Sequence, residues 1–258
     1  MLKRAVISTL QPFVEDRVYT VRNGLARGLR RRGGLGFVPT FGSPSAEEAF
    51  IGRLALEGLT VFDVGGYEGI FTLFFARRVG AAGRVVTFEP NPRSHARIVE
   101  NVRLNGFTNV QVRPIAIGSR PGTVALTFPA DETARGSIEP AIASEIRKEK
   151  QVRTVDVQID TLDGQIAAGL PEPDFVKIDV EGLERDVLAG MSGVIARRRP
   201  QLYIELHGAD AARKLENVTA VAELLWDRGY RLHHVESDRE LSTREQLTGA
   251  IRGHLYCT

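Results

Sequence analysis

Hydrophobic and polar positions along the chain follow two patterns. Short, largely apolar runs that end at glycine, proline or polar residues are typical of strands buried on both faces of a sheet. Longer stretches between them, with apolar residues at helical spacing, predict helices. The expected strands are Leu59–Val64, Arg84–Glu89, Asn109–Ile117, Asp174–Val180, Gln201–Leu206 and a closing antiparallel pair, Tyr230–Val235 and His254–Cys257. The expected helices are Ile70–Val79, Arg93–Asn105, Glu184–Ile195 and Thr219–Arg228.

This alternation predicts an α/β fold. Strands that alternate with helices form an open, doubly wound sheet with helices on both faces. We therefore expect a Rossmann-like, mostly parallel, seven-stranded sheet that a C-terminal antiparallel hairpin completes. Ser45 followed by Glu47 and Glu48 is a helix-start signal, so the main domain is expected over residues 46–258.

One stretch, at about residues 118–160, breaks the alternation. It contains two strand-like runs, Thr123–Phe128 and Val152–Gln158, on either side of the polar segment Ala130–Lys150. Insertions of this kind often cover a binding site as a lid, but they also occur as plain surface hairpins. The pattern predicts an inserted β-hairpin and leaves its role open.

Charge is unevenly distributed along the chain. The net charge is +2, yet residues 1–32 hold eight basic and two acidic side chains. We therefore expect a basic N-terminal arm over residues 1–45, helical at 13–32 and ended by Gly33 and Gly34. Such an arm is either a solvated, arginine-rich helix or a contact for nucleic acid, a membrane surface or a second subunit.

Composition excludes several classes of protein. Hydrophobic residues make up 43% and charged residues 26% of the chain, which is ordinary for a globular domain and excludes a disordered one. A single cysteine, Cys257, excludes an internal disulfide and a multi-cysteine zinc site. No run has the length of a membrane span or the form of a signal peptide. The expectation is a cytoplasmic protein without a membrane partner.

The strongest motif is a glycine-rich turn between the first strand and its helix. It reads Asp63-Val-Gly65-Gly66-Tyr67-Glu68-Gly69. Glu89 ends the next strand, twenty residues beyond Gly69, where open α/β sheets place a carboxylate for ribose hydroxyls.

The charges of this turn favour one cofactor. The pyrophosphate of a dinucleotide would be repelled by Asp63 and Glu68. S-adenosylmethionine has no phosphate and carries an ammonium and a sulfonium, for which acidic neighbours are favourable. The sequence therefore predicts S-adenosylmethionine as the cofactor.

Several blocks, in order, resemble the FkbM family of class I methyltransferases. The specific ones are Phe88-Glu89-Pro90 and Lys177-Ile-Asp179-Val-Glu181-Gly182, and the second block continues with Leu-Glu184. Weaker ones include Thr161-Leu162-Asp163 and Glu205-Leu-His207. The resemblance covers about residues 58–210. It implies S-adenosylmethionine-dependent O-methylation of a hydroxyl group on a sugar or natural product.

Candidate cofactor residues follow from the turn and the strand ends. Asp63, Gly65 and Gly69 are expected to hold the methionine portion, and Glu89 the two ribose hydroxyls. Asn91 either lies near the ribose or only caps the next helix. The remaining candidates are Gly66, Tyr67, Glu68, Pro90, Asp179 and, as flanks of the adenine, Ala116 and Ile117.

Candidate catalytic residues lie after the fourth and fifth strands. Alternation is expected to place Lys177, Asp179 and Glu181 on one face of an extended strand. His207 is the first candidate base because its ordinary pKa lies near neutrality, and Asp179 is the second. Lys177 also has a simpler interpretation, as an ion pair with a neighbouring acid.

Two further questions stay open at this point. Four of these side chains, Asp179, Glu181, Glu205 and His207, are also suitable ligands for a divalent ion, although the favoured mechanism needs no metal. The favoured acceptor is a small-molecule hydroxyl, since this acidic site would repel a nucleic acid. The alternatives are a nucleic-acid or protein methyltransferase and a non-catalytic binding module. A homo-oligomer formed through the arm is a further possibility.

Overall fold

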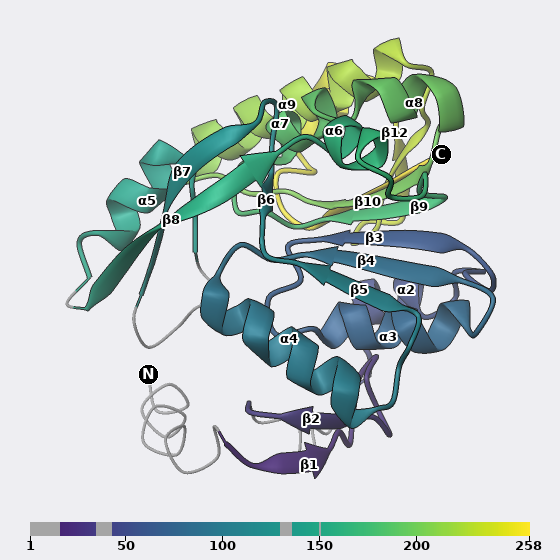
Figure 1. Cartoon of the computed structure of the whole chain (residues 1–258). Coiled ribbons are helices and arrows are strands. Elements are labelled where there is room, and N and C mark those ends of the chain that lie inside the picture. The colour runs from purple at the N-terminus through teal and green to yellow at the C-terminus, as the bar shows by residue number, and fades with distance from the viewer. Residues whose placement is uncertain (1–15, 35–42, 130–135, 150) are drawn as a thin grey trace.

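The computed structural model describes residues 16–34, 43–129, 136–149 and 151–258. Its centre is an eight-stranded sheet in the order β12-β11-β13-β10-β9-β3-β4-β5 (Figure 1). The strands are β3 (Thr60–Val64), β4 (Arg84–Phe88), β5 (Val110–Arg113), β9 (Phe175–Ile178), β10 (Gln201–Glu205), β11 (Leu232–His234), β12 (Arg239–Leu241) and β13 (His254–Cys257).

The predicted α/β architecture is confirmed. Strands β10, β9, β3, β4 and β5 pair in parallel, and β13 joins β10 and β11 antiparallel. The eighth strand, β12, pairs with β11 and was not among the seven expected strands. Its three residues include two charged side chains, Arg239 and Glu240, so it carries no hydrophobic pattern.

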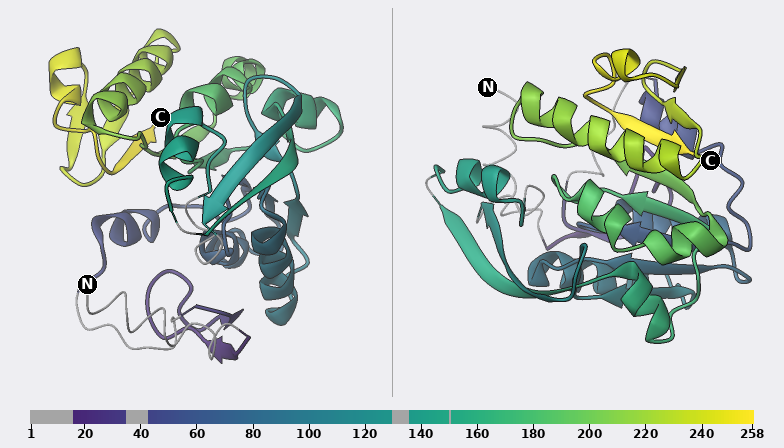
Figure 2. Two further views of the ribbon diagram at one scale, coloured as in Figure 1. Left: turned by 90° about the vertical axis from the view of Figure 1, so that its left-hand side faces the viewer. Right: turned by 90° about the horizontal axis from the view of Figure 1, so that it is seen from above.

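Helices cover both faces of the sheet, as Figures 1 and 2 show. On one face lie α2 (Ala46–Ile51), α3 (Ile70–Val79) and α4 (Pro92–Leu104). On the other lie α6 (Leu162–Ala167), α7 (Glu184–Ala189), α8 (Ser192–Arg198) and α9 (Ala211–Asp227). The short helix α10 (Arg244–Leu247) follows β12. Alternate strand residues supply the two cores: Phe62 and Val176 belong to one, Val61 and Phe175 to the other.

Several helix boundaries agree with the sequence, and others differ for local reasons. Ser45 caps α2 in a capping box with Glu48, as its position predicts. The single helix expected at 184–195 is two helices, because the chain turns at Gly190. A Cβ atom there would lie 2.0 Å from the carbonyl oxygen of Gly118. Helix α9 begins at Ala211, after the Asp210 cap, eight residues before the expected start at Thr219.

The inserted segment forms a second, three-stranded sheet in the order β6-β8-β7, at one end of the main sheet (Figure 2). It consists of β6 (Ala116–Ile117), β7 (Gly122–Pro129) and β8 (Val152–Asp160), with α5 (Pro140–Ile146) between β7 and β8. The strand expected over Asn109–Ile117 is divided at Pro114, which has no N–H to donate. Its second part, β6, pairs with β8.

The helix expected over residues 13–32 is wrong where the structure describes it. Residues 16–34 contain an antiparallel hairpin of β1 (Val18–Thr20) and β2 (Arg30–Arg32). Gly24 and Gly28 have φ values of +71° and +85°, which interrupt a helix and allow the turns between the strands. Residues 1–15 of the predicted arm lie outside the described residues.

The basic hairpin packs against α4 instead of standing free in solvent. Arg32 donates from Nε to Glu100 at 2.6 Å, and its backbone N–H donates to Asn101 at 2.8 Å. Arg31 is buried, with 5% of its surface exposed. These contacts do not support the interpretation as a solvated helix. Within the described ranges, no helix has the length and apolar character needed to cross a membrane.

Candidate functional site

A cavity of about 220 Å³ lies where β3, β4, β9 and β10 end. Ligands of open α/β sheets bind at this edge. Residues predicted for the cofactor and for catalysis line the same cavity: Gly65, Tyr67, Glu89, Pro90, Asn91, Ala116, Ile117, Asp179, Glu181 and His207. The structure thus brings together segments that are more than a hundred residues apart in sequence.

The glycine-rich turn brings the end of β3 against the end of β9. Gly65 has a φ of +87°, and a Cβ atom at this position would lie 1.7 Å from the carbonyl oxygen of Asp179. The amides of Gly65 and Gly66 donate to the carbonyl oxygen of Phe88 at 3.0 and 3.3 Å. Only glycine allows this approach, because any side chain would separate the two strand ends.

Glu89 is held by two backbone amides at the end of β4. One carboxylate oxygen accepts from the N–H of Tyr67 at 2.7 Å, and the other from the N–H of Asn91 at 2.8 Å. Burial raises the pKa of Glu89 to about 8, although both amide donors act in the opposite direction. Its carboxylate is therefore fixed in orientation and faces the cavity.

Asn91 and the pair Ala116 and Ile117 complete this end of the cavity. The side chain of Asn91 accepts from the amides of Arg93 and Ser94, so it caps α4, as one of its two interpretations predicts. Ala116 and Ile117 are both buried and line the cavity with Ile115. The three residues give this part of the cavity an apolar wall, on which a planar ring system could pack.

Five predicted residues do not line the cavity: Asp63, Gly66, Glu68, Gly69 and Lys177. Asp63 is fully buried and accepts from the Thr72 hydroxyl at 2.7 Å. Burial raises its pKa. Glu68 pairs with Arg31 of the hairpin. A direct role of these side chains in binding a ligand stays a prediction.

Lys177 is an ion-paired buried lysine. Its Nζ lies 2.9 Å from Oδ2 of Asp179 and 4.5 Å from the centre of the Phe71 ring. Burial lowers its pKa, but the charges of Asp179 and Asp63 outweigh burial, and the net shift is upward. The ammonium group therefore stays charged and fixes the carboxylate of Asp179.

The expected extended strand through Glu181 is wrong in part. Strand β9 ends at Ile178, and Glu181 has a φ of +52°, so it belongs to the turn before α7. Its side chain still reaches the same place, because its Oε2 lies 3.7 Å from Nε2 of His207.

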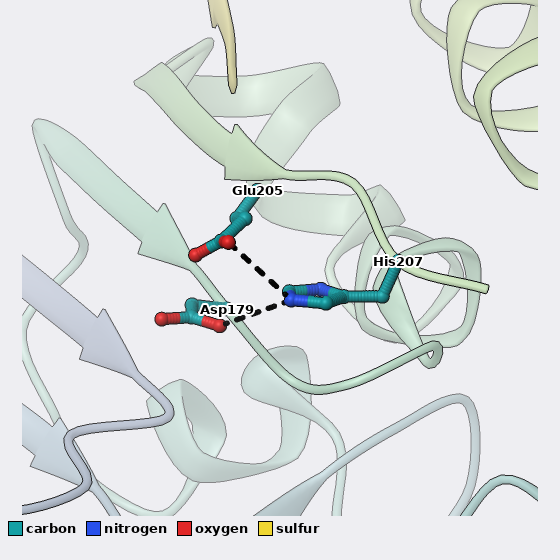
Figure 3. Close-up of side chains that lie close together, drawn as sticks. All are labelled: Asp179, Glu205 and His207. Carbon is teal, nitrogen blue, oxygen red and sulfur yellow. Dashed lines mark ion pairs between the residues drawn. The ribbon is translucent and has the colours of Figure 1, made fainter. Parts of the chain in front are cut away.

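Asp179, Glu205 and His207 line the cavity where β9 and β10 end, and Figure 3 shows their side chains close together. Nε2 of His207 lies 3.8 Å from Oδ1 of Asp179 and 3.5 Å from Oε1 of Glu205. One ligand atom from each of the three lies within 4.8 Å of the others, which is compact enough to hold a metal ion. The same group can also hold a proton.

The charge state of His207 differs from the sequence-based expectation. Burial lowers the pKa of the ring, but its bonds to Glu184 and Glu205 and the charge of Glu181 raise it to about 11. The ring is therefore cationic at neutral pH in the unliganded site and does not titrate near neutrality. Burial raises the pKa of Glu181 to about 7, so this carboxyl titrates near neutrality.

Sequence reasoning missed two sets of residues. Leu126, Gly136 and Ile138 of the inserted segment line the cavity, and nothing in their pattern distinguishes them from a surface hairpin. Glu184, which bonds to His207 at 2.9 Å, was predicted to start a helix and was given no role in the site. Its place in the Lys177–Glu184 block was a signal that could have identified it.

The strand order and the cavity at the strand ends define a class I methyltransferase fold. The family model described as "Methyltransferase FkbM domain" matches residues 63–232. The chain belongs to this family, as its motifs predicted.

Relatives and solved structures agree with this assignment. The chain is 30% identical over 180 residues to the 31-O-demethyl-FK506 methyltransferase FkbM of Streptomyces tacrolimicus, covering 60% of this chain and 68% of that protein. It is 27% identical over 145 residues to methyltransferase 1 of Beauveria bassiana, covering 51% of this chain and 57% of that protein. The chain thus spans little more than half the length of the Beauveria relative.

A solved structure supports the fold. The crystal structure of methyltransferase FkbM from Methylobacillus flagellatus matches 80% of this chain and 45% of its own, with a TM-score of 0.53 and 18% identity. At this identity the likeness concerns the fold alone.

Proposed function

We propose that this chain is an S-adenosylmethionine-dependent O-methyltransferase that acts on a hydroxyl group of a small molecule. The observation that carries the proposal is one cavity lined by Glu89 at one end and by Asp179, Glu205 and His207 at the other. The relative named for 31-O-demethyl-FK506 supports a natural-product hydroxyl as the acceptor. When bound, the cofactor supplies an electrophilic methyl group on its sulfonium.

The residues at the Glu89 end fit this cofactor. Each oxygen of the Glu89 carboxylate accepts one backbone N–H and keeps a second lone pair. Because the side chain lines the cavity, it can accept two ribose hydroxyls there. Ala116, Ile117 and Ile115 provide an apolar surface beside it for the adenine.

The acidic end of the cavity suits a positively charged sulfonium and a departing proton. Asp179, Glu181 and Glu205 all lie within 4 Å of Nε2 of His207, so three carboxylates face this ring nitrogen. A second positive charge beside His207 lowers the affinity of the ring for its proton. His207 can then accept the hydroxyl proton while the neighbouring carboxylates hold the acceptor.

A second cavity, of about 300 Å³, indicates the side from which the acceptor reaches His207. His207 and Leu183 line both cavities. The walls of the second cavity come from the start of α5, the start of α7 and the first half of α9, and include Glu139, Arg185, Arg213 and Asn217. We infer that a polar, hydroxylated acceptor lies there, with its reacting oxygen beside His207.

Partner and location also belong to the proposal. Arg31 and Arg32 pair with Glu68 and Glu100, so the described part of the basic arm does not offer these charges to a nucleic acid. We retain a small-molecule acceptor, no membrane partner and a cytoplasmic location as expectations. A homo-oligomer formed through the N-terminal segment is likewise an expectation.

Calorimetry with S-adenosylhomocysteine tests the cofactor half of the proposal. Glu89→Ala removes two hydrogen bonds to a charged group, each worth about 1.5–3 kcal/mol, so the Kd should rise at least about 100-fold. Glu57→Ala, an exposed position, is the matched control. An unchanged affinity in Glu89→Ala would sink the assignment.

Transfer of a radiolabelled methyl group tests the acceptor half. The probes are 31-O-demethyl-FK506 and a set of methyl glycosides, each incubated with labelled S-adenosylmethionine. Labelled product that resists mild base indicates an ether and supports O-methylation of an alcohol. Label found only in added RNA or protein would contradict a small-molecule acceptor, and cofactor binding without any transfer would favour a binding module.

A further inference from the structure

Glu184 is a buried carboxylate to which the proposed mechanism gives no task. It is the first residue of α7, and none of its surface is exposed. Burying a carboxylate is costly unless charged or polar partners satisfy it. Its contacts therefore indicate why it is there.

Three donors converge on the Glu184 carboxylate. Oε1 lies 2.9 Å from Nδ1 of His207 and 3.0 Å from the amide of Gly182, and Oε2 accepts from Nδ2 of Asn217 at 2.7 Å. Because an ionised carboxylate can only accept, Nδ1 of His207 carries the proton in this bond. Asn217 also donates to the backbone oxygen of His207 at 2.9 Å.

These bonds fix both the ring and the backbone of His207. With Nδ1 bonded to Glu184, the other ring nitrogen faces Asp179, Glu181 and Glu205 at 3.5–3.8 Å. We propose that Glu184 is a positioning residue: it orients His207 so that Nε2 faces the reacting hydroxyl, and Asn217 holds Glu184 in place. This inference rests on the proposed function, because it describes how His207, the proton acceptor of the proposed reaction, is oriented.

The proposed role is consistent with the balance of the reaction. If S-adenosylmethionine is bound, transfer of its methyl group from sulfur to the hydroxyl oxygen would leave a neutral thioether, and the hydroxyl proton would pass to Nε2 of His207. The Glu184 side chain stabilises the imidazolium through its bond to Nδ1, as carboxylates do in other carboxylate–histidine pairs. The proton then leaves to solvent through the neighbouring carboxylates.

Glu184→Gln is the informative variant. A glutamine has one acceptor oxygen, whereas His207 Nδ1 and Asn217 Nδ2 both donate. Either the Asn217 bond is lost, or the side-chain amide faces His207 and forces Nδ1 to become the acceptor. Glu172→Gln is the matched control, because Glu172 lines neither cavity and pairs with Arg197 at the surface.

The first readout is nuclear magnetic resonance of ¹⁵N-labelled protein, free and with S-adenosylhomocysteine. The His207 ring signals are assigned by their loss in His207→Gln. We expect a protonated Nδ1 with slow proton exchange in the wild type and in Glu172→Gln. In Glu184→Gln we expect fast exchange or an unprotonated Nδ1. An unchanged ring in Glu184→Gln would overturn the proposal.

The second readout is methyl transfer to whichever probe the wild type methylates. In Glu184→Gln we expect kcat to fall at least about tenfold, with the Kd for S-adenosylhomocysteine within about twofold of the wild type. Equal kcat in both proteins would overturn the proposal. If Glu184→Gln does not fold, Asn217→Ala and Glu184→Asp are measured instead, with the same expected direction and partial activity for the aspartate.

The two readouts separate this inference from the proposed function. The ring signals need no acceptor, so a protein that methylates none of the probes would count against O-methylation and still give a decisive result for Glu184. Conversely, if the wild type is active and the His207 ring signals are unchanged in Glu184→Gln, the proposed function would stand and the positioning role of Glu184 would be overturned.

Discussion

Arg31 of the N-terminal hairpin forms an ion pair with Glu68 of the glycine-rich turn. The side chain of Arg31 is 6% exposed and that of Glu68 is 23% exposed. The amide of Asn101 strengthens the link, because it donates to the backbone oxygen of Glu68 at 3.1 Å and accepts from Arg32 N–H at 2.8 Å. The basic hairpin therefore holds the turn that borders the cavity.

Arg31→Met should lower stability and weaken cofactor binding. Removing one partner of a buried ion pair costs about 3 kcal/mol or more, and the released turn would then have to be ordered by the ligand. Chemical denaturation measures the first effect, and calorimetry with S-adenosylhomocysteine the second. Arg30→Met, an exposed neighbour, is the control. Adding Glu68→Gln should recover part of the lost stability; no recovery would exclude the ion pair as the cause.

Binding of S-adenosylhomocysteine should tighten as pH rises from about 6 to about 8. Burial holds the pKa of Glu89 at about 8 in the unliganded site, whereas ribose hydroxyls donate to its ionised form. Binding therefore lowers this pKa and releases a proton below pH 8. Calorimetry in buffers of different ionisation enthalpy measures the release. Glu89→Gln should bind weakly at every pH; a wild-type pH dependence in this variant would assign the effect to another group.

Gly65→Ala should be far more damaging than Gly58→Ala. Both glycines have positive φ, +87° and +74°, but a Cβ atom at Gly58 meets nothing within 4 Å. The left-handed backbone alone costs about 1–2 kcal/mol, and the clash with Asp179 adds up to about 3 kcal/mol. Denaturation curves of both variants separate the two contributions. Equal losses would show that the strand ends can move apart freely.

Methyl transfer should survive dialysis against EDTA. The bonds of His207 to Glu184 and Glu205, together with the charge of Glu181, raise the pKa of His207 to about 11. The positive charge of the imidazolium therefore already neutralises part of the carboxylate charge that a metal ion would need. A divalent ion would have to displace this proton. The measurement is the transfer rate before dialysis, after it, and after addition of Mg²⁺. Loss of activity that Mg²⁺ restores would show that Asp179, Glu205 and His207 bind the metal instead.

Much of the central fold could be predicted because its patterns are local. Helix α3 begins and ends where the sequence predicts, and β4 differs by one residue. Buried parallel strands are apolar along their whole length, and glycine or proline marks where they stop. The turn Asp63–Gly69 and Glu89 were predicted as site residues by the same local spacing, and Gly65, Tyr67 and Glu89 line the cavity.

The N-terminal segment shows where such patterns are insufficient. Val18, Tyr19 and Thr20 have the side chains of a strand, but three residues form one only when a partner strand and a packing surface are available. Helix α4 offers that surface, at Asn101 and Glu100. No residue within 16–34 reveals this contact, because it lies some seventy positions away in the sequence.

The sequence by itself determined the alternating α/β order, the glycine-rich turn and the carboxylate at the end of β4, since each depends on neighbouring residues. Only the tertiary structure decided what the charged residues do. In the folded chain Arg31 forms a buried ion pair with Glu68, Lys177 pairs with Asp179, and Glu184 bonds to His207. The physical reason is that the charge state of a side chain is set by burial and by charges within a few ångströms, and those neighbours come from distant parts of the chain.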